Sequence, residues 1–144
     1  MRHIQHRIYR RRYGFTLIEL LVVLVILGLL AGLVGPRVLK YLGSAKTDTA
    51  QLQIEELGAS LDLYHLEVGH YPRSDEGLNA LVEKPAGVNN WNGPYLKKNT
   101  VPLDPWGNPY HYEYPGKNGE YDIYSLGTDN AAGGEGEAAD VVSW

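Results

Sequence analysis

Apolar residues run almost without interruption along one stretch near the start of the chain. From Phe15 to Gly35 the sequence reads FTLIELLVVLVILGLLAGLVG, and Glu19 is its only charged residue. A helix needs about 20 such residues to cross the hydrocarbon core of a bilayer. The pattern therefore predicts a membrane-spanning helix over this stretch.

The helix is predicted to continue beyond the span as an amphipathic one. Pro36 cannot donate a helical hydrogen bond, so we expect a kink or a locally melted segment there. Farther along, apolar residues recur mostly at steps of three and four, with charged residues between them. These apolar residues are Leu42, Ala45, Leu52, Leu57, Leu61, Tyr64 and Val68. Gly69 and Pro72 stop the pattern, which predicts one helix of roughly 50 residues ending near Gly69.

The rest of the chain predicts a small domain with short elements. Ser74 can cap a brief helix that runs to about Val82. A long loop rich in Pro, Gly and aromatic residues follows, and its aromatic side chains are expected to pack against the core. Residues 110–114 and 121–125 then alternate with period two, and the turn residues 115–119 between them predict a hairpin. The expected fold is α+β, a lollipop in which a long N-terminal helix packs on a small antiparallel sheet.

Charge orients the chain in a membrane. The first 14 residues contain five arginines and no acid, whereas only Arg37, Lys40 and Lys46 follow soon after the span. By the positive-inside rule, the N-terminus lies in the cytoplasm and the rest of the chain outside it. Without those five arginines, 8 of the 13 basic residues remain against 17 acids, a net charge of -9. Nucleic acid is therefore not expected as a partner.

The sequence offers little for catalysis. It has no cysteine, which excludes disulfides and thiolate metal sites. It also lacks the G-x-S-x-G, H-E-x-x-H and P-loop patterns, and its scattered acids are typical of solvated faces. We therefore do not expect an enzyme, although a membrane-tethered hydrolase or binding module is a possible alternative class.

Two acidic features invite a functional interpretation. A carboxylate at mid-span costs about 2.5 to 3.5 kcal/mol, so Glu19 either sits at the headgroup level or requires a partner. The tail from Asp129 to Asp140 holds four acids, no base and three glycines. Such a loop is either simply solvated or folded around a hard cation such as Ca²⁺, which carboxylate and carbonyl oxygens would bind.

The junction between the basic leader and the apolar stretch carries a family resemblance. Residues 12–19, RYGFTLIE, resemble the type III signal of type IV pilins and pseudopilins. The resemblance implies that a prepilin peptidase cuts after Gly14 and N-methylates Phe15. It also implies that Glu19 neutralises the Phe15 amine of a neighbouring subunit during assembly. The expected division is a removable leader over 1–14, a transmembrane and filament-core helix over 15–36, and a periplasmic domain over 37–144.

Motifs in the domain narrow the resemblance to the major pseudopilins of bacterial type II secretion systems. They lie at residues 71–72, 76–81, 91–96, 104–110 and 124–129. The resemblance implies a helical homopolymer in the periplasm, built on an inner-membrane assembly platform together with minor pseudopilins, that helps to export folded proteins through the outer membrane. The rival is a type IV pilin of a surface pilus, which usually closes its C-terminal region with a disulfide.

Major pseudopilins bind structural calcium in the C-terminal loop, and the resemblance carries this site over to the present chain. By position in the Ser-Leu-Gly-x-Asp motif, Asp129 and the carbonyl of Leu126 are the implied ligands. The second carboxylate has three candidates, which are Glu135, Glu137 and Asp140.

Overall fold

The structure is a computed structural model that describes residues 14–144, so most of the predicted leader lies outside the described residues. The chain divides into two compact units, one ending at Leu39 and the other comprising Lys40–Trp144. Helix α1, Leu17–Val68, contributes its first part to one unit and its second part to the other.

The bounds of α1 follow from local chemistry. The helix begins at Leu17, two residues into the apolar stretch. It continues through Pro36 without a break, so the locally melted segment, one of the two expected alternatives, is not present. It ends before Gly69, whose φ of +94° is the left-handed conformation that glycine adopts readily. The Gly69 amide donates to the carbonyl of His65 at 2.8 Å and closes the last turn. The predicted end near Gly69 is confirmed.

The core of the second unit rests on one face of α1. Its buried helical residues recur at steps of four and three, as a single helix face requires: they are Ala50, Ile54, Leu57, Leu61 and Tyr64. Part of the predicted apolar face was therefore wrong. Leu42, Ala45 and Leu52 are exposed, and at 100° per residue Ala45 and Leu52 fall on the opposite side of the helix from Leu57.

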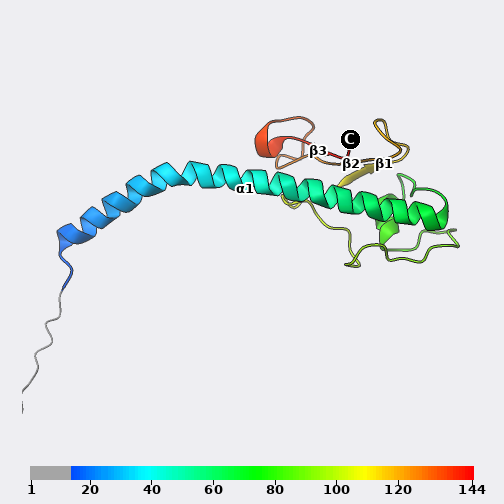
Figure 1. Ribbon diagram of the computed structural model, residues 1–144, viewed down its shortest axis with the longest axis horizontal. Coiled ribbons are helices and arrows are strands. Elements are labelled where there is room, and N and C mark those ends of the chain that lie inside the picture. Colours follow the sequence, from blue (N-terminus) through cyan, green and yellow to red (C-terminus); the bar gives the residue numbers. More distant parts are fainter. Residues whose placement is uncertain (1–13) are drawn as a thin grey trace, which may run out of the picture. The chain divides into compact units, whose positions relative to one another are not determined.

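A three-stranded antiparallel sheet, in the order β1-β2-β3, lies along the second half of α1 (Figure 1). Strand β1 is His111–Glu113, β2 is Asp122–Ser125 and β3 is Val141–Val142. The first two strands pair with Tyr112 opposite Ile123, which confirms the predicted hairpin. Strand β3 pairs with the end of β2 and was not predicted, because two residues are too few for a recognisable alternation.

The segment between α1 and the sheet differs from prediction at its start. The short helix is a 3₁₀ helix, η1, over Gly77–Leu81, and no side chain caps it. Ser74 instead donates to the carbonyl of Tyr114 at 2.9 Å and accepts from the Tyr114 amide at 2.8 Å. The hydroxyl thus ties the chain after the helix to the end of β1, a long-range contact that outweighs its local capping tendency.

The long loop after η1 packs through its aromatic side chains, as expected. The Trp91 indole donates to the carbonyl of Ala80 at 2.8 Å, and the Tyr95 hydroxyl donates to Glu67 at 2.7 Å. Both rings also pack against the buried cluster.

Candidate assembly and ion-binding sites

The predicted cleavage junction lies just before α1. Gly14, Phe15 and Thr16 have no regular secondary structure, and all three are exposed. Peptidases act on accessible backbone outside regular structure. The Gly14–Phe15 bond has both properties in the structure.

Glu19 takes part in the start of α1 in a way that the sequence analysis missed. The Thr16 amide lies 3.3 Å from Oε2 of Glu19, and the Glu19 amide lies 3.3 Å from the Thr16 hydroxyl. These reciprocal contacts form a capping box, which the Thr-x-x-Glu spacing could have revealed. Within residues 14–144 only Oε2 is engaged, so Oε1 is available to a second donor.

The first half of α1 contains an apolar stretch that is long enough to cross a membrane. Within residues 14–144, no other part of the chain buries that stretch. A packed core helix of a soluble domain would be mostly covered. These side chains therefore need lipid or another protein around them.

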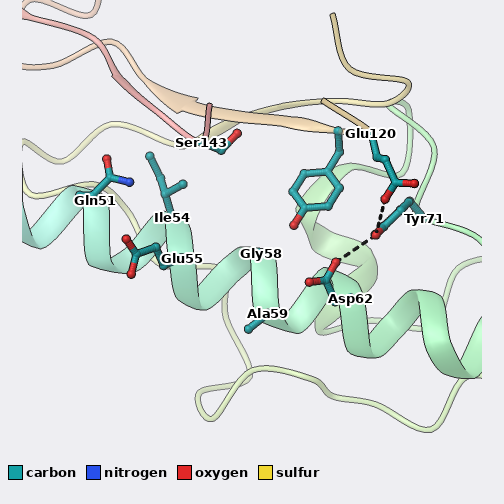
Figure 2. A pocket seen from close by; sticks show the side chains of 10 residues that line it. Gln51, Ile54, Glu55, Gly58, Ala59, Asp62, Tyr71, Glu120 and Ser143 are labelled. Atoms are coloured by element: carbon teal, nitrogen blue, oxygen red, sulfur yellow. Dashed lines mark hydrogen bonds between the residues drawn. The ribbon is translucent and has the colours of Figure 1, made fainter. Parts of the chain in front are cut away.

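A groove runs beside the second half of α1 and contains the acids Glu55, Asp62 and Glu120 (Figure 2). The Tyr71 hydroxyl lies 2.9 Å from Asp62 and 3.1 Å from Glu120 and can donate to only one of them at a time. Burial, together with these carboxylates, raises the pKa of Tyr71 and keeps it a neutral donor. The contacts connect the end of the helix to the turn before β2.

Two of the predicted ion ligands, Asp129 and Asp140, accept backbone hydrogen bonds within the C-terminal loop. Asp140 precedes β3, and its Oδ2 accepts from the Gly133 amide at 3.0 Å. Its Oδ1 is buried, and no group among residues 14–144 forms a hydrogen bond with it. Asp129 accepts from the Ala131 amide at 3.1 Å and is otherwise exposed. A buried, unpaired carboxylate oxygen is costly, and a cation would relieve that cost.

The other two candidate acids have different positions. Glu135 is exposed at the start of the 3₁₀ helix η2, Gly136–Ala138. Glu137 accepts from the Trp106 indole at 3.2 Å and lies 4.0 Å from Lys46 on α1. Among the described residues, no three Asp, Glu or His side chains group as metal ligands, so any ion site here would require backbone carbonyls.

A buried acid outside the predicted set organises the base of this loop. Asp104, which is 4% exposed, accepts from the amides of Trp106 and Asn108 at 3.0 and 2.8 Å. The Ser125 hydroxyl donates to it at 2.5 Å and accepts from the Gly127 amide at 3.2 Å. These hydrogen bonds thus hold three segments together: the end of β2, the loop formed by residues 104–108, called the Trp106 loop below, and the start of the C-terminal loop.

Comparison with known proteins finds matches to both the N-terminal segment and the rest of the chain. Residues 37–144 match the family described as type II secretion system (T2SS), protein G, and residues 9–35 match the prokaryotic N-terminal methylation motif. The type II secretion system core protein G of Pseudomonas aeruginosa is 49% identical over 139 residues, which cover 94% of this chain and 96% of that protein. The protein of the same name from Vibrio cholerae is 44% identical over 138 residues, covering 94% and 93%.

A solved structure shows the same fold. The major pseudopilin of the type 2 secretion system of enterohaemorrhagic Escherichia coli superposes with a TM-score of 0.61 and 31% identity, over 70% of this chain and 88% of that one. This confirms the predicted α+β, pilin-like fold with a long N-terminal helix and an antiparallel sheet. The chain therefore belongs to the type II secretion system protein G family, the major pseudopilins, which are structural subunits and not enzymes.

Proposed function

We propose that the chain is made as a precursor and becomes competent for assembly when a prepilin peptidase cuts the Gly14–Phe15 bond and N-methylates Phe15. The exposed, non-helical backbone at this bond and the methylation motif over residues 9–35 support the proposal. Mass spectrometry of the N-terminal peptide tests it directly. A mature chain that begins at methylated Phe15 is expected, whereas an intact leader on assembled protein would contradict it.

The mature subunit polymerises through the first half of α1 into a periplasmic pseudopilus. The observation that carries this proposal is the apolar stretch of α1, which the described part of the chain leaves entirely unburied. In the single subunit the bilayer of the inner membrane covers it, with the rest of the chain in the periplasm. In the filament, the corresponding helices of other copies take the place of lipid.

Glu19 sets the register of this polymer by pairing with the Phe15 amine of a neighbouring subunit. The amine exists only after cleavage, and a carboxylate inside hydrocarbon calls for a charged partner. The free Oε1 supports this role, because Glu19 can keep its capping contacts with Thr16 while it accepts from a second donor.

The polymer is a component of the type II secretion system. The family assignment supports a filament of many copies of this chain, joined by minor pseudopilins and built on an inner-membrane assembly platform. Its growth helps to export folded proteins through the outer membrane. Deletion of the chain's gene is expected to leave these exported proteins in the periplasm.

The C-terminal loop binds Ca²⁺ as a structural ion. Asp129, Asp140 and the carbonyl of Leu126 would hold it, and the unpaired, buried Oδ1 of Asp140 is the observation that fits. These are hard oxygen donors of the kind that calcium prefers. The ion would supply positive charge to a loop with four acids and no base. The chain's own contribution is the loop geometry, with positive φ at Gly127, Gly133, Gly134 and Gly136.

Thermal unfolding of the mature chain in detergent micelles tests the ion site. An ion that binds only the native state stabilises it by about 2.7 kcal/mol at 100 times its Kd. Calcium is expected to raise the melting temperature of the wild type, and excess chelator to lower it. Asp129→Ala and Asp140→Asn should lose this response, while Glu83→Gln, a change at an exposed acid outside the loop, should keep it. A wild-type transition that calcium and chelator leave unchanged would refute the site.

A further inference from the structure

The side chain of Glu137 lies against helix α1 and the Trp106 loop. Its Oε2 accepts from the Trp106 indole at 3.2 Å and lies 4.0 Å from the Lys46 ammonium. The pair with Lys46 is long and partly exposed, so it contributes little as an ion pair. Any larger contribution of the Glu137 side chain to stability must therefore come from its other contacts.

The main contact is with Gly43 of α1, which is buried. A Cβ atom at this position would lie 2.6 Å from both Cγ and Oε1 of Glu137. Glycine in the middle of a helix lowers its stability, because the residue loses more backbone freedom than any other. Here the missing side chain makes room for Glu137 to lie directly on the helix surface.

The backbone of the same residue holds the C-terminal loop together. The Glu137 carbonyl accepts from the Thr128 amide at 2.8 Å. A Cβ at Gly127 would lie 2.7 Å from this carbonyl, so the two segments pack closely. The Gly127 carbonyl in turn accepts from the Asn108 side chain at 3.1 Å. Glu137 thus contacts the loop through its backbone and the helix through its side chain.

We infer that Glu137 is a docking residue and not an ion ligand: it fastens the C-terminal loop to α1 at Gly43 and to the Trp106 indole. Because loop and helix meet at this side chain, order in the loop stabilises the helical segment around Gly43 and Lys46. The docking itself needs no ion. Its control by calcium rests on the ion site proposed above.

A double-mutant cycle between Gly43 and Glu137 tests the docking. Gly43→Ala improves helix propensity, so without the contact it should raise the melting temperature by roughly 4 °C. In the wild-type background the added methyl group forces the Glu137 side chain off the helix, so the lost contact offsets the gain and we expect a smaller rise or none. In the Glu137→Ala background the space is free and the gain should appear. An equal gain in both backgrounds would overturn the inference.

The Trp106 indole gives a second readout in the mature chain in micelles. Its N–H signal in an NMR spectrum, assigned with Trp106→Phe, should exchange with solvent at least about tenfold faster in Glu137→Ala, a loss that corresponds to about 1.4 kcal/mol. Glu137→Gln keeps an oxygen acceptor and should preserve most of the protection. Unchanged exchange in Glu137→Ala would contradict docking, whatever the calcium site does.

Calcium titrations separate docking from ligation. Asp140→Asn should lose calcium binding, whereas Glu137→Ala should still bind calcium. In the wild type, calcium should slow amide exchange over residues 43–50, and in Glu137→Ala it should not. Loss of calcium binding in Glu137→Ala to the extent seen in Asp140→Asn would make Glu137 a ligand and overturn the inference. Wild type that binds no calcium would refute the ion site, while the cycle at Gly43 still decides the docking.

Discussion

Asp122 shows how a single buried acid can define the turn of a hairpin. It is 2% exposed and accepts from the amides of Lys117, Asn118 and Gly119 at 2.8 to 3.3 Å. The Asn118 side chain donates to it as well, at 3.0 Å. Burial opposes its charge, but these hydrogen bonds prevail and hold the pKa of Asp122 below its ordinary 3.8. The turn therefore depends on a charged carboxylate.

Replacing this residue should be costly and should change the response to acid. Asp122→Asn is expected to lower the free energy of unfolding by about 2–4 kcal/mol at neutral pH, because several donors lose a charged acceptor. With a lowered folded pKa, the wild-type contribution is complete well above the unfolded pKa of about 3.9 and is lost as pH falls through the folded pKa. Urea unfolding at pH 7 and in steps below pH 4 checks this. Asp75→Asn, a change at an exposed acid, serves as the control. If wild type and Asp122→Asn lose stability in parallel as the pH falls, the proposed role of the Asp122 charge is contradicted.

A pair of substitutions can separate the capping contacts of Glu19 from its proposed pairing with the Phe15 amine. Glu19→Gln keeps an acceptor for the capping box and removes the charge, whereas Thr16→Ala keeps the charge and removes the cap. If charge pairing sets the register, Glu19→Gln should reduce filament yield at least about tenfold, equivalent to about 1.4 kcal/mol. Thr16→Ala should cost only the cap, about 0.5–2 kcal/mol of helix stability. Electron microscopy compares the filaments that each variant releases when the outer membrane is opened, at matched membrane levels of the two variants. Normal filaments from Glu19→Gln would contradict the charge-pairing role.

Among the elements, the end of β2 connects two loops, the one around Trp106 and the C-terminal loop. Ser125 is fully buried and links Asp104 of the Trp106 loop with the Gly127 amide of the C-terminal loop. Removing its hydroxyl leaves a buried carboxylate without one of its donors. The loops on both sides of β2 should therefore loosen together.

The substitution Ser125→Ala measures this link. We expect a loss of about 1–3 kcal/mol in the free energy of unfolding, the penalty for an unsatisfied buried polar group. Ser44→Ala, at an exposed serine on α1, should change stability by less than about 0.5 kcal/mol. Urea denaturation followed by circular dichroism gives both values. A Ser125→Ala variant as stable as Ser44→Ala would show that the link is unimportant.

Elements defined by local signals could be predicted from sequence, and those defined by distant contacts could not. The end of α1 at Gly69 and the hairpin around residues 115–119 follow from glycine, proline and alternation nearby. By contrast, Ser74 forms a hydrogen bond with Tyr114, which lies forty residues away in the sequence. The Glu137 side chain packs against Gly43 of α1, which lies more than ninety residues earlier. The buried face of α1 was only partly predicted, because the exposed Leu52 carries the same apolar signal as the buried Ile54.

At the scale of the whole molecule, the two units differ in whether their apolar side chains are buried. In the unit that ends at Leu39, the described residues leave a long apolar helical stretch uncovered, whereas the unit Lys40–Trp144 buries its own core. In water this stretch needs lipid or another protein around it. In the proposed function, neighbouring helices replace lipid as the cover of this stretch.

The export of folded proteins by the bacterium that makes this chain tests the central claim most directly. The chromosomal gene is deleted and replaced by plasmid copies of the wild type or of Glu19→Ala, at equal membrane levels and with cleavage after Gly14 verified. Exported protein is then measured in the medium and in the periplasm. We predict that wild type restores export and that Glu19→Ala, although processed and inserted, leaves the exported proteins in the periplasm. Export by the deletion strain, or full export with Glu19→Ala, would contradict a pseudopilus assembled through this helix.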